Sequence, residues 1–592
     1  MKIPTLLFFL LLSACPRAFS QAAGKVQIVR PDVIFHGARI ITTDASFSSH
    51  QAMRIKEGRI AGLGTDAEIL AGKEAQTRLV DLGGKTVLPG LIDSHVHPGA
   101  AMTEFDHPIP TMESIDDVLA YVRSRAEVLP EGEWIEIRQV FITRLREQRY
   151  PTRAELDAAA PNNPVLFATG PDASLNSAAL RLSGIDRDFR VADGGPGYVE
   201  KDASNGELTG ILRGCTRYVK VVPRKESKKP TEEDHLRRTI ELFKDYNARG
   251  ITAIADRNAE PDAIARYAKM RDSGELSVRL FVSASIANLG PIETIQERIR
   301  SVAGHSLRKG NTADSAMLRL IGIKTFLDGG MLTGSAYMRE PWGVSKIYGI
   351  TDPMYRGVLQ IPRERLVPMV RTAMESGLQF TAHSVGDGAV HLLLDVYREL
   401  SREMPRQFRA TRPCITHCNF MSAGAIDELA QLGAVADIQP IWLHLDAHTL
   451  EAQFGRDRLR YFQPLRSLFA AGAVVGGGSD HMQKIGAERA VNQYNPFLGI
   501  WIAISRRARG LEAPVHLEEA LTREQALRFY TANNAHLLFV EKEIGSLEPG
   551  KLADFIVIDT DILKCPVDDI PKIKVLRTFL GGREVFARDT VN

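Results

Sequence analysis

The chain has few cysteines, no excess of charge of either sign, and no long apolar run after its first residues. Five cysteines in 592 residues exclude a scaffold held by disulfides. Lys and Arg number 74 against 72 Asp and Glu, and this net charge of +2 gives no indication of a surface built for nucleic acid or acidic lipid. With 44% hydrophobic and 25% charged residues the composition is globular, which excludes collagen, coiled coil and global disorder. At about 100–200 residues per domain, the length predicts roughly two or three structural units.

Residues 1–20 are typical of a secretory signal peptide. A single lysine precedes the apolar residues 3–12, a run shorter than the ~20 residues that a membrane-spanning helix needs. Residues 18–20, Ala-Phe-Ser, have the small-x-small form that signal peptidase cleaves, whereas residues 12–15, Leu-Ser-Ala-Cys, resemble a lipoprotein box. We therefore expect export to the periplasm or the medium, with a lipid anchor at Cys15 as the open alternative. No later segment has the pattern of a membrane span.

Both ends of the remaining chain have the alternating pattern of short strands separated by turns. Residues 25–86 contain several such strands, and residues 541–592 contain a strand followed by a hairpin around Gly581-Gly582. Neither piece is large enough to bury a core of its own. We therefore predict one small composite β-sandwich built from residues 25–86 and 541–592.

Residues 87–540 alternate helices and strands, which predicts the α/β class and a (β/α)8 barrel of the TIM type. A long insertion, residues 100–230, separates the first two predicted strands and has its own capped helix beginning at Ser114. We expect this insertion to form an α+β subdomain that acts as a lid or substrate wall. The eight predicted barrel strands are residues 87–93, 251–256, 278–284, 318–326, 378–383, 414–417, 435–439 and 473–478.

Four histidines and one aspartate stand at the carboxyl ends of predicted strands, where a barrel carries its active site. His95 and His97 follow the first strand, and alternate residues of a strand point the same way. His383 and His417 end the fifth and sixth strands, and Asp480 follows the eighth. Imidazole and carboxylate ligands together favour Zn²⁺ over Mn²⁺, Fe²⁺ or Co²⁺. We therefore predict a zinc site at this end of the barrel.

Lys324 lies inside an apolar predicted strand, where an isolated ammonium group is very costly. One interpretation is a salt bridge, for example with Asp328. The other is a lysine carboxylated by CO₂, whose oxygen atoms bridge two metal ions. The spacing of the residues does not decide between them.

Residues 84–97, GKTVLPGLIDSHVH, resemble the first-strand signature of the amidohydrolase superfamily. Residues 323–329 (IKTFLDG), 383–387 (HSVGD) and 478–480 (GSD) resemble its amidohydrolase family 3, or YtcJ-like, branch. Residues 547–554 (LEPGKLAD) are similar to the tail that returns the chain to the β-sandwich in many members. The resemblance covers nearly all the chain after the signal segment.

The resemblance implies a metal-dependent hydrolase that cleaves an amide-type C–N bond, other than a peptide bond, through a metal-activated water. His95, His97 and Asp480 would hold one metal ion, and His383 and His417 the second. A carboxylated Lys324 would bridge the two ions, which are expected to be Zn²⁺. Asp480 would also be the catalytic residue, accepting the proton of the water and delivering it to the leaving nitrogen.

The chain departs from the branch at two places, and both leave the substrate open. Residues 170–177 lack the histidine that often precedes the Asn176-Ser177 pair, and His481 replaces a common aromatic residue. Two alternatives to a two-metal enzyme acting on a small amide therefore stay open. One is a mononuclear deaminase or cyclic-amide hydrolase in which Lys324 is structural, and the other is an exported regulatory protein without turnover.

Several other residues are possible pocket components but are more simply explained as structural. We expect loop or capping roles for Asn176, Asp172 and Arg257, core packing for Trp342 and Trp501, and inert packing for Cys414 and Cys418. His481 could either reach the site beside Asp480 or lie in a solvated loop.

Overall fold

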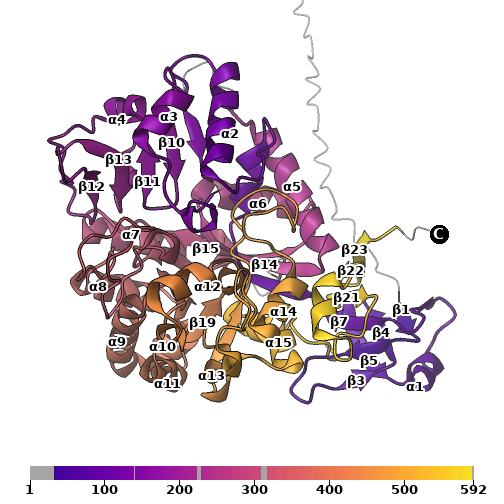
Figure 1. The fold of residues 1–592 in the computed structure, drawn as a ribbon. Helices are drawn as coiled ribbons and strands as arrows, with labels where there is room; N and C mark the ends of the chain where they lie inside the picture. Colours follow the sequence, from indigo (N-terminus) through magenta and orange to yellow (C-terminus); the bar gives the residue numbers. More distant parts are fainter. Residues whose placement is uncertain (1–31, 139, 223–228, 309–315, 590–592) are drawn as a thin grey trace, which may run out of the picture.

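The structure is a computed structural model that describes residues 32–138, 140–222, 229–308 and 316–589. The predicted signal peptide, residues 1–20, and the alternative lipid site Cys15 lie outside the described residues. A central barrel carries a β-sandwich and, elsewhere on its surface, the inserted subdomain (Figure 1). Within the described ranges, no helix combines the length and the apolar character needed to cross a bilayer.

Eight parallel strands form the barrel and confirm the predicted (β/α)8 architecture. Helices between the strands pack on the outside, where Leu393 of α9 (Asp387–Glu403) joins Phe380 and Ile415 in one apolar cluster. Hydrogen bonding joins the strands in chain order: β8 (Leu91–Val96), β14 (Ile251–Ala259), β15 (Arg279–Ser285), β16 (Leu318–Phe326), β17 (Gln379–Ser384), β18 (Cys414–His417), β19 (Val435–Ile438) and β20 (Val474–Gly477).

Local sequence signals explain where the outer helices begin and end. Thr231 caps α5 (Glu232–Ala248), because its hydroxyl accepts the Asp234 N–H at 3.1 Å while the Asp234 carboxylate accepts the Thr231 N–H at 3.0 Å. Gly433 ends α11 (Ala423–Leu432) in the left-handed conformation that glycine adopts without strain. The other outer helices are α6 (Pro261–Asp272), α7 (Ile292–Ala303), α8 (Arg363–Glu375), α10 (Pro405–Thr411), α12 (Ile441–Phe454), α13 (Leu465–Ala470), α14 (Pro496–Ser505), α15 (Arg523–Phe529) and α16 (Ala532–Leu537).

The prediction of one first barrel strand at residues 87–93 is wrong, because two strands of different sheets meet there. β7 (Thr86–Pro89) pairs in the sandwich with β2 (Arg39–Ile41) and β21 (Phe555–Ile558), whereas β8 belongs to the barrel. Gly90 separates them at a close approach, since a Cβ atom there would overlap the Thr252 side chain. The sandwich therefore extends to Pro89, and His95 lies within the barrel strand instead of beyond it.

The barrel closes between β8 and the residues that follow β20. The Asp480 N–H donates to the His95 carbonyl, and the His97 N–H donates to the His481 carbonyl, both at 2.8 Å. The buried Asp93 carboxylate accepts the Ser479 hydroxyl at 2.6 Å and the Ser479 N–H at 3.1 Å. Closure thus uses the segments that carry three of the predicted ligands.

The composite sandwich consists of a four-stranded and a six-stranded sheet. Phe555 and Phe579 stack on each other with ring centroids 4.3 Å apart, and Phe35 packs edge-on against both at 5.0 and 5.1 Å, so the core joins both ends of the described chain. The remaining elements are β1 (Val33–His36), β3 (Ser49–His50), β4 (Ala52–Lys56), β5 (Arg59–Gly64), α1 (Asp66–Ala71), β6 (Arg78–Asp81), β22 (Val575–Leu580) and β23 (Arg583–Ala587).

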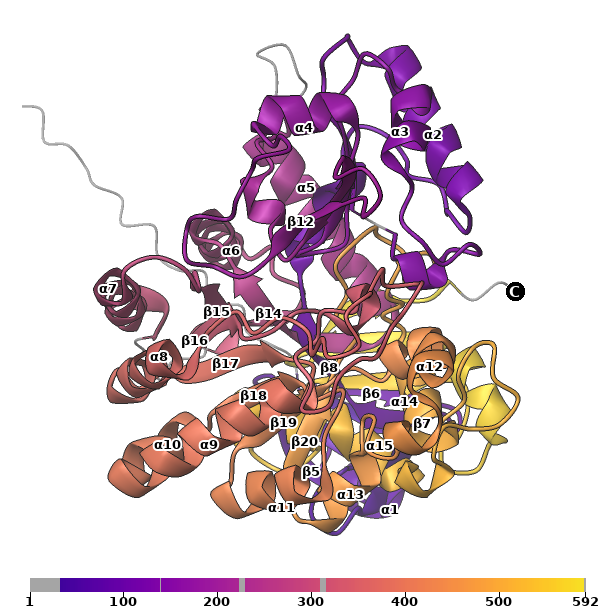
Figure 2. The same ribbon diagram turned by 60° about the vertical axis from the view of Figure 1, so that its left-hand side comes forward.

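The insertion forms its own five-stranded sheet with three helices, and it packs on loops at the carboxyl ends of the barrel strands (Figure 2). Phe141 and Phe167 of the insertion share an apolar cluster with Leu332 and Trp442 of the barrel. Its elements are α2 (Ile115–Val128), β9 (Ile135–Ile137), α3 (Arg153–Ala159), β10 (Val165–Ala168), β11 (Ala173–Leu175), α4 (Ser177–Ser183), β12 (Tyr198–Lys201) and β13 (Leu208–Arg213).

Replacing Gly478 by alanine should destabilise the barrel at its closure. The new methyl group would overlap the Asp93 carboxylate and crowd the His95 amide. We expect a loss of about 1–3 kcal/mol in the free energy of unfolding, measured by chemical denaturation. Gly424→Ala, on the exposed side of α11 with open space around its Cβ position, is the matched control and should be neutral or stabilising. Equal stability of the two variants would contradict this account of the closure.

Candidate functional site

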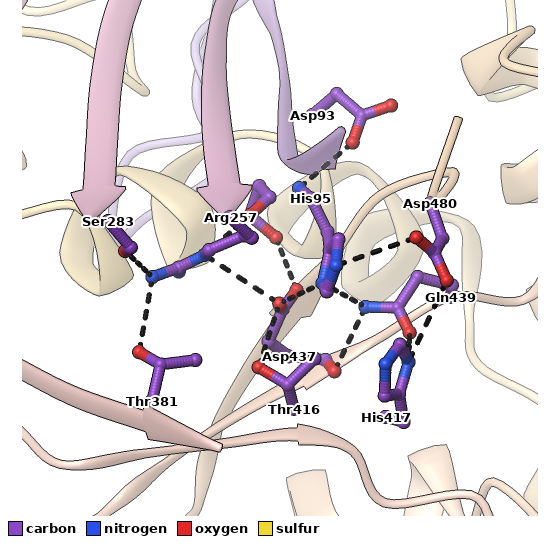
Figure 3. Close-up of polar contacts among 12 residues, drawn as sticks. Asp93, His95, Arg257, Ser283, Thr381, Thr416, His417, Asp437, Gln439 and Asp480 are labelled. Carbon is purple, nitrogen blue, oxygen red and sulfur yellow. Dashed lines mark hydrogen bonds and ion pairs between the residues drawn. The ribbon is translucent and has the colours of Figure 1, made fainter. Parts of the chain in front are cut away.

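The six predicted ligands all stand at the carboxyl end of the barrel. His95, Lys324, His383 and His417 lie in β8, β16, β17 and β18, and two further residues, His97 and Asp480, follow β8 and β20. Asp480 Oδ1 lies 3.5 Å from His95 Nε2 and 3.2 Å from His97 Nε2. Asp480 Oδ2 lies 4.0 Å from His417 Nδ1 (Figure 3). Asp480 is therefore the common neighbour of three imidazoles from two sides of the barrel.

Three of these residues form a compact donor set that fits a divalent cation. His95, His417 and Asp480 each offer a ligand atom, and these atoms lie within 4.8 Å of one another. His95 Nε2 and Asp480 Oδ1 are buried, and neither has a hydrogen-bond partner among the described residues. Buried polar atoms without a partner are rare in folded proteins. A bound cation would satisfy both atoms, and nitrogen and carboxylate oxygen are donors that zinc accepts.

His383 completes a continuous run of imidazoles around the site. Its ring centroid lies 4.5 Å from that of His417, and the His417 centroid lies 5.1 Å from that of His95. Burial lowers the pKa of His383 to about 3 and the pKa of His95 and His417 well below the usual value. These three imidazoles are therefore neutral near pH 7, the state in which a ring nitrogen binds a metal ion.

The Lys324 side chain is almost fully buried and faces the same space. No described residue forms an ion pair with its ammonium group, and Nζ lies 5.0 Å from the Phe326 ring centroid. Asp328 instead accepts the backbone N–H groups of Tyr337, Val385 and Gly386 at 2.9–3.0 Å. The salt-bridge interpretation with Asp328 is therefore wrong. Burial lowers the pKa of Lys324 to about 8, so part of the population is a neutral amine near neutral pH.

Two polar side chains that were not predicted from the sequence form hydrogen bonds with the rings of two predicted ligands. His95 Nδ1 donates to Asp437 Oδ2 at 2.9 Å, and His417 Nδ1 donates to Gln439 Oε1 at 2.7 Å. Both acceptors come from the seventh predicted strand, two residues apart and so on the same face. A pair of polar residues on the inward face of a buried strand was the signal that could have identified them.

The remaining candidate residues divide into structural residues close to the cavity and residues away from it. Asn176 caps α4, where its side chain accepts the Ala179 N–H at 3.0 Å. Asp172 accepts the Gly214 N–H at 2.6 Å. The buried His481 does not reach the ligands, because its Nδ1 accepts the Tyr246 hydroxyl at 2.8 Å and its Nε2 donates to backbone carbonyls.

The tryptophans and cysteines also have structural positions. The Trp342 Nε1–H donates to the Ala336 carbonyl at 2.8 Å, and the Trp501 Nε1–H donates to Asp568 at 3.1 Å. Cys414 and Cys418 are buried free thiols, and the Cys418 thiol contacts the Ile415 carbonyl at 3.4 Å. Inert packing therefore accounts for both cysteines. Arg257 is fully buried beneath the ligands and makes no part of the cavity wall.

A cavity of about 710 Å³ opens above the ligands. Barrel and insertion both contribute to its wall, so the insertion forms part of the space that a substrate would enter. Its floor contains His97, Lys324, His383, His417 and Asp480. The apolar part of its wall includes Phe141, Leu166, Met331, Leu332, Trp442 and Met482.

The chain matches known proteins along almost its whole length. A model described as the amidohydrolase family matches residues 78–586. N-substituted formamide deformylase of Arthrobacter pascens is 28% identical over 568 residues, which cover 93% of this chain and 97% of that protein. The putative amidohydrolase YtcJ of Bacillus subtilis is 25% identical over 577 residues, covering 94% and 99%. An uncharacterised metal-dependent hydrolase from Pyrococcus horikoshii shares the fold, with a TM-score of 0.64 at 20% identity over 91% of this chain and 99% of that one.

Zinc should stabilise the folded protein, and this effect should depend on His95. A ligand that binds only the folded state adds about 2.7 kcal/mol at a concentration one hundred times its dissociation constant. We expect added Zn²⁺ to raise the thermal midpoint of the metal-stripped wild type and to have little effect on His95→Ala. His50→Ala, in β3 of the sandwich, serves as the control and should keep the wild-type response. A response of His95→Ala equal to that of the control would contradict a metal site at this position.

Proposed function

The chain belongs to the amidohydrolase family, as its sequence resemblance indicated, and we propose that it is a metal-dependent hydrolase of amide-type C–N bonds other than peptide bonds. The observation that carries the proposal is the pair of buried, unpartnered atoms, His95 Nε2 and Asp480 Oδ1, beneath an apolar cavity. The match to N-substituted formamide deformylase supports the reaction class. Suitable substrates are small N-acyl compounds, N-substituted formamides, carbamates or ureas.

We propose that the six residues hold two zinc ions. His95, His97 and Asp480 would bind the first ion, His383 and His417 the second, and a carboxylated Lys324 would bridge them. A divalent cation at such ligands lowers the pKa of a bound water towards ~7 and polarises a carbonyl group.

Carboxylation of Lys324 requires the neutral amine. Its nitrogen lone pair would form a bond to the carbon of CO₂, one proton would leave to solvent, and a carbamate anion would result. The burial of Lys324, its lowered pKa and the absence of an ion pair with any described residue support this step. The new negative charge would face three neutral imidazoles, an arrangement that a cation would stabilise.

Asp480 is proposed to be the catalytic residue. Its carboxylate would take the proton of the attacking water and later deliver it to the leaving nitrogen. The hydrogen bond from the Asp480 N–H to the His95 carbonyl holds the backbone of this residue in place. The apolar wall formed by Phe141, Leu166 and Trp442 would exclude bulk water and accept an apolar substituent of the substrate.

A single-metal enzyme is the second candidate, and one observation favours it. The most compact donor set, His95, His417 and Asp480, combines residues that the two-metal scheme assigns to different ions. In that case Lys324 would remain a lysine, and the reaction would be a deamination or the opening of a cyclic amide.

We also propose that residues 1–20 direct export, and that the partner is a small molecule and not a nucleic acid.

Asp480→Asn should abolish nearly all turnover, because asparagine cannot accept the proton. Positioned general acid–base groups contribute roughly 10²–10⁴-fold to rate, so kcat should fall by at least about 10²-fold. Activity should be measured on a panel of N-substituted formamides and N-acyl amines, beside the zinc content of each preparation. Asp568→Asn, an exposed carboxylate bound to Arg507, is the control and should retain wild-type kcat. Near-normal turnover of Asp480→Asn would overturn the assigned role.

Restoring activity to metal-stripped protein should require both zinc and bicarbonate. We expect about two zinc ions per chain and a mass increase of one CO₂ that is absent from Lys324→Met, measured by elemental analysis and native mass spectrometry. Full activity with zinc alone in CO₂-depleted buffer, at about one ion per chain, would instead establish the single-metal candidate.

A further inference from the structure

A polar layer fills the barrel interior directly beneath the ligands, where TIM barrels usually pack branched apolar side chains. Ser94, Arg257, Asp437 and Gln439 are all 0% exposed. They come from β8, β14, β19 and the residue after β19, which lie around the closure of the barrel. Arg257 extends the layer to the opposite side, because its Nη1–H donates to Gln379 of β17. In Figure 3, dashed lines join Asp437 to Arg257 and to His95, and join Gln439 to His417. Burying a polar side chain costs free energy unless it forms hydrogen bonds inside the protein. A buried layer of four polar side chains therefore indicates a role beyond packing.

Asp437 uses its two oxygen atoms for different tasks. Oδ1 accepts the Ser94 hydroxyl at 2.6 Å, which anchors the carboxylate to the strand that carries His95. Oδ2 accepts His95 Nδ1–H at 2.9 Å. Because the proton is held on Nδ1, the other ring nitrogen keeps its lone pair, and that atom is the one that faces Asp480.

Gln439 also accepts a hydrogen bond from the Nδ1 atom of a histidine, His417. Its Oε1 accepts His417 Nδ1–H at 2.7 Å, which leaves the lone pair on Nε2 of that ring. Its Nε2–H donates to the Asp437 carbonyl at 3.0 Å, so the amide cannot turn without breaking a second bond. Both imidazoles are thus held through Nδ1 by residues of one strand, although the nitrogen nearest Asp480 is Nε2 in His95 and Nδ1 in His417.

Arg257 balances the charge of this layer. Its Nε–H donates to the Ser94 carbonyl and its Nη1–H to Gln379 Oε1, both at 2.9 Å. The same Nε atom lies 3.8 Å from Asp437 Oδ2, so the guanidinium is the nearest positive charge to that carboxylate. A buried carboxylate without such a partner would be strongly disfavoured.

We propose that Asp437 and Gln439 are positioning residues that fix the rings of His95 and His417 with Nε2 free for a metal ion, and that Ser94 and Arg257 hold Asp437 in place. Metal-binding histidines commonly donate their second N–H to a carboxylate or carbonyl, and loss of that acceptor lowers metal affinity by about 10–100-fold. This inference rests on the proposed metal centre and assigns a role to residues outside it.

The test measures zinc affinity by competition with a chromophoric chelator, together with the visible spectrum of the cobalt-substituted protein. Asp437→Asn and Gln439→Leu should each weaken zinc binding by about 10–100-fold and change the cobalt spectrum. Ser94→Ala, which removes only the anchor of Asp437 Oδ1, should cause a smaller loss, of a few-fold. Thr325→Val is the matched control, since this buried strand hydroxyl has no hydrogen-bond partner among the described residues, and should bind zinc as the wild type does.

The outcomes separate this inference from the proposed function. If wild type binds zinc and the folded Asp437→Asn and Gln439→Leu variants bind it equally well, with an unchanged cobalt spectrum, the positioning role is overturned while the metal centre stands. A lower thermal midpoint without a change in zinc affinity also overturns it, because it identifies a purely structural role. If Asp437→Asn does not fold, the zinc affinity and the cobalt spectrum of Gln439→Leu decide the question. Failure of the wild type to bind zinc, cobalt or manganese would overturn both proposals.

Discussion

The closure between the first and last barrel strands is the constraint on which the site depends. It joins residues 93–97 to residues 478–481 through two backbone hydrogen bonds and the Asp93 carboxylate. These bonds lie at the carboxyl ends of the barrel strands, where the six predicted ligands stand. His95, His97 and Asp480 are therefore placed by the same bonds that complete the fold. Any change that loosens the closure should also separate the ligands.

Three other parts of the structure surround the predicted ligands at this end of the barrel. The polar layer around Arg257 and Asp437 orients the imidazoles from below, while the insertion supplies an apolar wall from above. The sandwich also affects the position of the site, because its strand β7 leads directly into β8. The pairing of β7 in the sandwich thus fixes where the first barrel strand begins. The chain thus brings six polar side chains to one end of the barrel, beneath a cavity with a largely apolar wall.

Much of this arrangement could be predicted because it follows local rules. The alternation of helices and strands in residues 87–540 indicated eight barrel strands, and active-site residues at the carboxyl ends of the strands are a property of such barrels. Residues 86–96 could not be divided correctly, because one apolar run serves two sheets and only the pairing of Thr86–Pro89 with β21 separates them. Asp437 and Gln439 were missed because their roles come from contacts with His95 and His417, which are distant in sequence. The position of His481 depends likewise on Tyr246, across the barrel.

X-ray absorption spectroscopy at the zinc edge of the reconstituted protein tests the central claim most directly. The account predicts a first shell of nitrogen and oxygen at about 2.0–2.2 Å, with the outer-shell scattering of several imidazoles. Sulfur at about 2.3 Å would indicate binding by a cysteine, and a shell without imidazole scattering would indicate a site away from the predicted histidines. Either result would contradict a metal centre at the closed end of the barrel.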